Sequence, residues 1–183
     1  MSQPPRLPTG HHDARMAGSA GDPVDNQAAA HRVAQLFFLA HRGLTGDANA
    51  YLRDLGLGRA HYRVLYFAAR LPGVTVGEML DILDITAQGV ARVLNRMLDE
   101  GYLRQETDRG DRRRRRLYVT EAGARLERDV FARQAVIIDA AIAAAGAGAQ
   151  AGFAAMMMAL ISADDRVILD RLGTATGGGE TQT

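Results

Sequence analysis

Apolar residues recur at three- and four-residue spacing along most of the chain, which is the spacing of amphipathic helices. Between residues 27 and 42 this pattern predicts a first helix, whose apolar positions are Val33, Leu36, Phe37 and Ala40. We expect the glycines at 43–46 to break it and a short helix, capped by Asp47, to end near Leu55.

The middle of the chain predicts short helices joined by tight turns. A helix over residues 60–71 ends at a Pro-Gly pair. Thr75 and Glu78 then have the spacing of a capping box, which begins a helix of about two turns. After a two-residue turn, Thr86 caps a second helix that Gly101 ends. Two short helices joined in this way predict a helix-turn-helix.

The second half of the chain predicts a hairpin followed by long helices. Strands are expected over 102–107 and 113–119, with turn residues at 108–111 between them. A helix should follow over 120–145, and a last one over 149–172. The predicted fold class is therefore mainly α, of the α+β type, with one small hairpin.

Composition narrows the classes of function. The chain has 183 residues, enough for one domain with a buried core, and no cysteine, which excludes disulfides, thiol redox chemistry and cysteine-based zinc sites. His31 and His41 fall on different helix faces, and His11 and His12 lie near the N-terminus, so no metal site is predicted. No nucleophile and base converge in the pattern, so we expect neither catalysis nor a cofactor.

Both ends of the chain lack the pattern of a folded element. Residues 1–26 hold four of the five prolines and no apolar run, so we expect a flexible arm without a signal peptide. A disordered tail is expected over 173–183. Residues 140–163 carry no charge, but they are mostly alanine and glycine, so two helices joined by a glycine turn are predicted rather than a membrane span. We expect a cytoplasmic protein without a membrane partner.

Positive charge is concentrated between Arg104 and Arg116. Seven arginines and three acids give this segment a charge of +4, whereas the whole chain carries +1. All 22 basic residues are arginine, whose guanidinium group binds phosphate and guanine edges in a bidentate way. A nearly neutral protein with one strongly basic hairpin is expected to bind a polyanion, and double-stranded DNA is the leading hypothesis.

The second helix of a helix-turn-helix lies in the major groove of DNA. Its exposed side offers as DNA-binding candidates Thr86, Ala87, Gln88, Arg92, Asn95 and Arg96. Gln88 suits an adenine edge and Arg92 a guanine edge, whereas Thr86 and Arg96 suit phosphate. An alternative interpretation is that these residues are the solvated face of an amphipathic helix.

The hairpin adds a second set of DNA-binding candidates, Arg109, Asp111, Arg112, Arg113, Arg114 and Arg115. Asp111 and Arg113 are two apart on a segment predicted to be extended, so they should share a face. We expect the Asp111 carboxylate to pair with the Arg113 guanidinium and direct it into a minor groove. The neighbouring arginines, Arg116 included, would mostly contact phosphate. The alternative is a solvated arginine-rich surface.

These segments resemble the MarR family of transcriptional regulators. The spacing of the family's wing is matched by Asp108, Asp111, Arg112, Arg113, Thr120 and Gly123. The turn and recognition helix are matched by residues 83–86 together with Val90, Arg92, Arg96 and Gly101. The preceding helix is matched by Leu57, Val64, Leu65 and residues 72–75.

Three features depart from the family pattern. Gly58 stands where the family usually has a helix-capping Ser or Thr, and the run of five arginines is heavier than the usual wing. Gly89 lies within the recognition helix, where it costs up to about 1 kcal/mol of helix stability relative to alanine. The arginine run leaves open whether sequence-specific or nonspecific binding dominates.

The resemblance implies a domain organisation and a homodimer. A winged helix-turn-helix DNA-binding domain would occupy residues 57–119, and the dimerisation region would combine helices in 27–56 with those in 120–172. Apolar residues in 130–161, including the run Met156-Met157-Met158, exceed what one small core can bury, so we expect them to pack in the dimer. A two-fold dimer would bind a pseudo-palindromic operator.

The resemblance also implies a repressor that a small aromatic or anionic effector releases from DNA. The candidate effector contacts are Phe38, His41, Arg42, His61 and Tyr62, which are alternatively ordinary interface residues. Two other functions stay open. One is a low-specificity, nucleoid-type DNA-binding protein, and the other is a winged-helix module that docks on protein, whose binding would be insensitive to salt.

Overall fold

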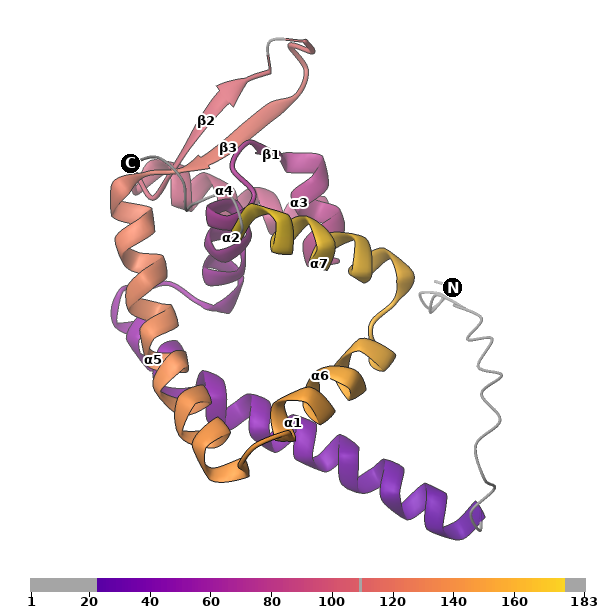
Figure 1. Cartoon of the computed structure of the whole chain (residues 1–183). Helices are drawn as coiled ribbons and strands as arrows, with labels where there is room; N and C mark the ends of the chain where they lie inside the picture. The colour runs from indigo at the N-terminus through magenta and orange to yellow at the C-terminus, as the bar shows by residue number, and fades with distance from the viewer. Residues whose placement is uncertain (1–22, 109, 177–183) are drawn as a thin grey trace, which may run out of the picture. The chain divides into compact units, whose positions relative to one another are not determined.

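The structure, a computed structural model, describes residues 23–108 and 110–176 (Figure 1). The expected arm over most of 1–26, the end of the expected tail and the candidate Arg109 lie outside the described residues. The chain divides between Ala40 and His41 into two compact units. The second unit, His41–Thr183, contains the helix-turn-helix and the hairpin.

The first helix is longer than the sequence predicts. Helix α1 is a single helix, Pro23–Asp54, so the break expected at the glycines of 43–46 is wrong. A helical glycine costs only about 1 kcal/mol relative to alanine, and burial of Ala48 and Leu52 in the core outweighs this cost. The helix also begins four residues earlier than predicted, at a proline, which is well tolerated in a first helical turn.

The helix-turn-helix agrees closely with the prediction. Helix α2 (Arg59–Arg70) is followed by β1 (Val74–Thr75), α3 (Val76–Leu83) and the recognition helix α4 (Ala87–Asp99). The predicted capping box is confirmed, because the Thr75 hydroxyl accepts from the Glu78 amide while the Glu78 carboxylate accepts from the Thr75 amide. The turn passes through Asp84 in a left-handed conformation (φ 49°), and the Thr86 hydroxyl caps α4.

The hairpin belongs to a three-stranded antiparallel sheet. Strands β2 (Leu103–Thr107) and β3 (Arg115–Val119) form the predicted hairpin, and β3 also pairs with β1, giving the order β1-β3-β2. The two-residue β1 is too short to leave an alternating pattern, and it was not predicted. Figure 1 shows the hairpin projecting beyond the helices beside it, as a wing.

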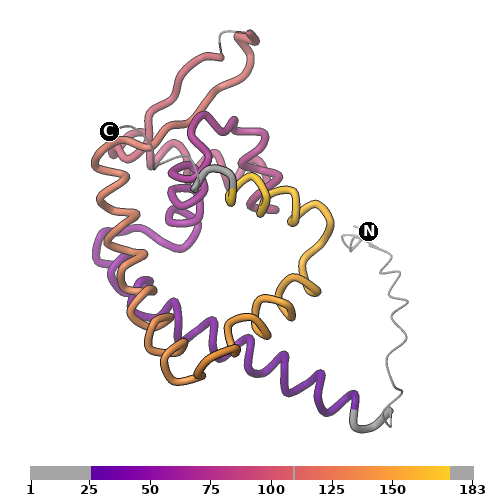
Figure 2. Tube along the Cα trace, in the orientation of Figure 1, coloured from indigo at the N-terminus to yellow at the C-terminus, as the bar shows by residue number. Residues whose placement is uncertain are grey.

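The C-terminal part contains three helices instead of the predicted two. Helix α5 (Glu121–Ala145) has the predicted bounds, but the segment expected as one last helix is split into α6 (Ala149–Leu160) and α7 (Ala163–Thr176) (Figure 2). The break has a local cause, since the Ser162 hydroxyl and the Asp165 carboxylate form a capping box that starts α7.

Length and hydropathy together determine whether a helix in the described part of the chain could cross a bilayer. No single helix there is both long and apolar enough to cross a membrane. Helices α5 and α6 meet both conditions only when they are taken together, and they are bent by 116° at the glycine turn between them.

The second unit has one hydrophobic core, built where α2, α3, α4, the sheet and the start of α5 meet. Its largest fully buried side chains are Leu52, Leu65, Met79, Leu83, Met97, Leu117, Val64, Val90 and Val130, so the end of α1 also contributes to it. The C-terminal helices leave many apolar side chains outside this core, and α6 has no buried residue. Large exposed apolar residues on these helices are Phe131, Val136, Ile138, Ile142, Phe153, Met156, Met158, Leu160, Val167 and Leu169.

Candidate nucleic-acid interface

The recognition helix presents its predicted DNA-contacting face to solvent. Val90, Val93, Leu94 and Met97 are buried on one side of α4. The candidates on the other side are all exposed, namely Thr86, Ala87, Gln88, Arg92, Asn95 and Arg96. The Thr86 hydroxyl accepts from the Gly89 amide at 3.3 Å, so it caps the helix that carries the other candidates.

Arg96 differs from the other candidates because its guanidinium group is held within the chain. It donates to the Glu100 carboxylate at 2.8 Å, one turn along α4. It also lies against the turn between α1 and α2, where a Cβ added at Gly56 would come within 2.9 Å of it. Arg96 therefore links the recognition helix to this turn.

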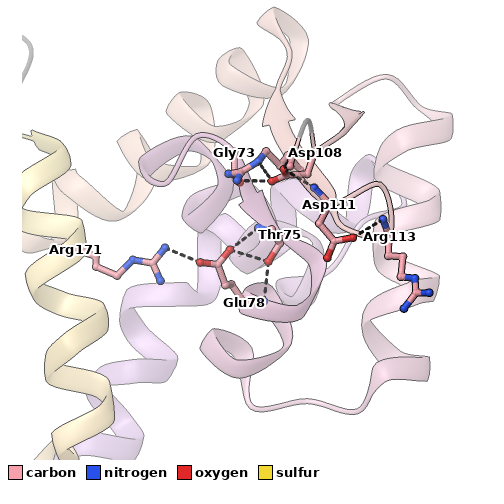
Figure 3. Close-up of polar contacts among 9 residues, drawn as sticks. Gly73, Thr75, Glu78, Asp108, Asp111, Arg113 and Arg171 are labelled. Carbon is pink, nitrogen blue, oxygen red and sulfur yellow. Dashed lines mark hydrogen bonds and ion pairs between the residues drawn. The ribbon is translucent and has the colours of Figure 1, made fainter.

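The tip of the wing is a turn instead of the extended segment that the sequence predicts. Strand β3 begins only at Arg115, so Arg113 lies in the turn. The Asp111 carboxylate accepts from the backbone N–H of Arg113 at 2.9 Å (Figure 3). The prediction that it pairs with the Arg113 guanidinium group is therefore wrong. The Arg113 side chain points away from Asp111 in this view. Asp111 therefore fixes the backbone of the tip without aiming the arginine.

A different aspartate holds the wing in place. Asp108 is 8% exposed, and its Oδ1 accepts from the amides of Gly110 at 2.7 Å and Asp111 at 3.2 Å. Its Oδ2 pairs with the guanidinium group of Arg116, which also donates to the Gly73 carbonyl oxygen at 3.1 Å. The hydrogen bond from the Gly110 amide lowers the pKa of Asp108 most, burial opposes this effect, and the Arg116 guanidinium group and the Asp111 amide lower the pKa further.

Sequence reasoning missed this role of Asp108 and assigned Arg116 to phosphate. An aspartate that opens a turn commonly accepts from backbone amides two and three residues later, so the signal was present. The pairing with Arg116 depends on the register of β2 and β3, which the sequence does not reveal.

Three arginines at the tip are available to a partner. Arg112, Arg113, Arg114 and Arg115 are all exposed. The Arg115 guanidinium group donates to the Thr107 hydroxyl across the hairpin. Among the residues that the structure describes, no side chain pairs with the guanidinium groups of Arg112, Arg113 or Arg114. The tip therefore presents three positive charges that the described part of the chain does not neutralise.

Glu78 connects the helix-turn-helix to the last helix. Its Oε2 accepts from the amide and hydroxyl of Thr75 at 2.8 and 2.7 Å, while its Oε1 accepts from Arg171 of α7 at 3.2 Å (Figure 3). Burial opposes ionisation, but the hydrogen bonds from Thr75 and the charge of Arg171 outweigh it and lower the pKa of Glu78.

The second unit contains a cavity of about 690 Å³ on the α2 side of the domain. Its polar and aromatic lining is made by His41, Thr45, Asn49, Arg59, Tyr62, Arg63, Tyr66, Phe67, Phe131 and Gln134. Of the predicted effector contacts, His41 and Tyr62 line this cavity, whereas Arg42 and His61 do not. Phe38 lies in the first unit and is 73% exposed. Arg59 and Arg63 also line the cavity, and the sequence did not predict them as contacts.

Tyr62 and Gln134 form a polar contact in the wall of this cavity. The Tyr62 hydroxyl donates to Oε1 of Gln134 at 3.1 Å. Burial, and next the charge of Glu127, raise the pKa of Tyr62, so the phenol is neutral at physiological pH.

His61 has a structural role instead of the predicted effector contact. Gly58 offers no side chain to cap α2, and its N–H donates to Nδ1 of His61 at 3.1 Å. This bond requires the neutral ring with its proton on Nε2. Burial, and next the charge of Arg96, lower the pKa of His61. His61 thus makes up for the unusual glycine at the N-cap.

No group of three or more His, Asp or Glu side chains that could hold a metal ion occurs among the described residues. The charged clusters of the second unit are ion pairs between arginine and a carboxylate. The chemistry that this surface supports is therefore binding of an anionic partner by arginine, with an amide and a hydroxyl on α4 beside it.

Known proteins are similar to this chain in sequence and in fold. The HTH-type transcriptional regulator PetP of Rhodobacter capsulatus is 39% identical over 127 residues, which are 69% of this chain and 76% of PetP. The MarR family model matches residues 55–114. FabT of Streptococcus pneumoniae, solved in complex with DNA, superposes on 72% of this chain and 94% of its own with a TM-score of 0.64 at 17% identity. PcaV of Streptomyces coelicolor, solved with its natural ligand, covers 78% of this chain and 96% of its own with a TM-score of 0.56 at 23% identity.

These likenesses confirm the predicted fold class and the predicted family. The solved structures show the same mainly helical winged helix-turn-helix fold. The similarity to PetP extends beyond the helix-turn-helix that the family model matches. The chain is a DNA-binding transcriptional regulator, and it belongs to the MarR family.

Proposed function

We propose that this regulator is a sequence-specific repressor that binds a pseudo-palindromic operator as a homodimer. The observation that carries the proposal is the pairing of two exposed surfaces in one unit, the outer face of α4 and the arginine tip of the wing. The face of α4 offers side chains suited to base edges, and the tip of the wing offers positive charge for the phosphate backbone and the minor groove of DNA.

The DNA contacts divide by chemistry. Gln88 binds an adenine edge and Arg92 a guanine edge, with Asn95 and Ala87 beside them. The Thr86 hydroxyl donates to phosphate while it caps α4. Arg113 enters the minor groove, and the remaining arginines of the tip, Arg109, Arg112, Arg114 and Arg115, contact phosphate. Arg96, held by Glu100, contributes a weaker phosphate contact.

The partner that covers the exposed apolar helices is a second copy of the chain. Val136, Ile142, Phe153 and Leu160 are 42–70% exposed on α5 and α6, which is more apolar surface than helices left in water normally carry. Residues 27–56 and 120–172 then form the dimerisation region around the DNA-binding domain at 57–119. A two-fold dimer places its recognition helices about 34–36 Å apart.

The cavity beside α2 binds the effector. Arg59 and Arg63 supply positive charge, and Tyr62, Tyr66 and Phe131 supply aromatic surface, which together suit a small aromatic anion. Titration with benzoate, a simple aromatic carboxylate, tests this assignment. If benzoate weakens DNA binding by the natural protein but not by the variant Arg59→Ala, the cavity is supported as an effector site.

The proposed regulator acts in the cytoplasm, without an enzymatic activity or a cofactor of its own. Its alternative is low-specificity binding, which the heavy arginine tip favours, since four exposed arginines in a row bind any duplex. A footprint on DNA upstream of its own gene distinguishes the two. Two protected half-sites about one helical turn apart support the operator model, and uniform protection supports the alternative.

A further inference from the structure

A series of contacts runs from the last helix to the wing, with side-chain hydrogen bonds at both ends and the pairing of strand β1 with β3 between them. Its members are Arg171, Glu78, Thr75, Arg116 and Asp108, and we name this series the polar chain. Figure 3 shows Arg171 of α7 directed at Glu78, and the Asp108 pairing close to Gly73 and Thr75. The polar chain thus joins a helix of the expected dimerisation region to a hairpin that contacts DNA.

The first step of the polar chain uses the two oxygens of one carboxylate. Oε1 of Glu78 accepts from Arg171 at 3.2 Å, and Oε2 accepts from the amide and hydroxyl of Thr75. The oxygen that caps α3 is therefore not the oxygen that binds α7. Loss of Arg171 would remove the donor to Oε1 and leave the Glu78 carboxylate held through the hydrogen bonds from Thr75 to Oε2.

The second step crosses the sheet. Thr75 of β1 lies opposite Arg116 of β3 in the antiparallel register, and the Gly73 N–H donates to the Leu117 carbonyl at 2.9 Å. The Arg116 guanidinium group binds back to the Gly73 carbonyl oxygen. Strand β3 is therefore attached to the turn before β1 through both backbone and side chain.

The third step reaches the tip. Arg116 pairs with Asp108, and Asp108 holds the amides of Gly110 and Asp111 at the start of the turn that carries Arg112 to Arg114. A two-stranded hairpin is only marginally stable by itself, so its direction depends on the contacts at its base. The polar chain supplies contacts at that base.

We propose that Arg171 is a positioning residue, which holds the wing in its DNA-binding pose through Glu78, Thr75, Arg116 and Asp108. This inference rests on the proposed DNA contacts of the wing. It assigns to α7 a role in DNA binding in addition to any role in the dimer. The test therefore measures the mobility of the wing directly.

Two variants interrupt the polar chain at its first step, and a third serves as a matched control. Arg171→Ala removes the cation. Glu78→Gln removes the anion but keeps an amide oxygen that can complete the capping box. Arg166→Ala removes the same charge from the same helix, at a side chain that binds the Met158 carbonyl oxygen and does not belong to the polar chain.

The first readout is the mobility of the wing without DNA. Because the chain has no cysteine, Arg112→Cys places a single nitroxide label on the tip, and Arg128→Cys places one on exposed α5 as a reference. We expect Arg171→Ala and Glu78→Gln to increase the mobility of the label at 112 and leave the label at 128 unchanged. Unchanged mobility at 112 would overturn the proposal, whether or not the protein binds its operator.

The second readout is affinity for a duplex from upstream DNA. We expect Arg171→Ala and Glu78→Gln each to weaken binding about twofold to fivefold, the range that a partly exposed ion pair supplies, and the double variant to weaken it no further. The two substitutions change the net charge in opposite directions, so a shared loss excludes a long-range charge effect. Arg171→Lys should restore most of the affinity. Equal losses in Arg171→Ala and Arg166→Ala, or opposite effects of the two interrupting variants, would contradict the proposal.

Discussion

The carboxylate of Asp108 and the guanidinium group of Arg116 form an ion pair at the base of the wing. Both partners have further bonds, since Asp108 accepts from two backbone amides of the tip and Arg116 donates to the Gly73 carbonyl oxygen. The pair therefore connects the turn that carries the exposed arginines to the sheet that fixes the recognition helix.

Asp108→Ala should weaken operator binding roughly tenfold, because it removes a charged acceptor from three donors at once. Asp111→Ala should weaken binding only about twofold to threefold, because Asp111 accepts a single backbone hydrogen bond. Anisotropy titrations of both variants against the same duplex make the comparison. A larger loss for Asp111→Ala would contradict the role given to Asp108.

Arg113→Ala should reduce operator affinity about 10- to 100-fold and leave the dimer intact, because a minor-groove arginine supplies much of the specific binding. Arg125→Ala is the control, since Arg125 is exposed on α5 and pairs with Glu121 away from the wing. Titrations of both variants with operator DNA measure the affinity, and sedimentation measures whether the dimer is intact. Near-normal affinity of the Arg113 variant would refute the minor-groove assignment.

Stability should fall as the pH falls below about 6.5, the usual pKa of histidine. Burial and Arg96 lower the folded-state pKa of His61, so its contribution is fully present above the unfolded pKa and is lost as the pH falls toward the folded value. In His61→Gln the amide oxygen can still accept from the Gly58 amide, but it does not titrate. The fall in Tm between pH 7.5 and 5.5 should therefore be smaller in His61→Gln than in the natural protein, and an equal fall would show that His61 is not responsible.

Gly123→Ala should destabilise the fold by about 2–4 kcal/mol. An added Cβ would lie 2.1 Å from the Tyr102 carbonyl oxygen and 2.9 Å from Val119, so the start of α5 must move away from the sheet. Gly77→Ala is the matched control, since nothing lies within 4 Å of an added Cβ there. Denaturant unfolding of the two variants should show a loss for Gly123→Ala and no loss for Gly77→Ala, and equal stability would contradict this packing.

The sequence predicted those parts of the fold that local side chains determine. The capping box of Thr75 and Glu78 and the cap at Thr86 fixed the helix-turn-helix to within a residue or two. The same kind of signal was available at Ser162 and Asp165 but was missed inside an apolar run. The break expected at Gly43 failed for the opposite reason, because packing outweighed local propensity.

The sequence predicts which residues of the site are exposed. It does not predict contacts that depend on the register between strands. The outer face of α4 followed from helical periodicity. The pairing of Arg116 with Asp108 depends on which residues face each other across β2 and β3. The contact between Arg171 and Glu78 joins residues 93 positions apart, which no local pattern reveals.

Sequence-specific DNA binding is tested most directly by fluorescence anisotropy. The purified protein is titrated against a duplex from the DNA upstream of its own gene and against a scrambled duplex, at 50 and 200 mM salt. We expect tighter binding to the upstream duplex, and a loss of roughly 10³- to 10⁵-fold between the two salt concentrations if 6–10 phosphates are contacted. Equal affinity for both duplexes, or binding that does not respond to salt, would contradict a sequence-specific regulator that binds DNA through the recognition helix and the wing.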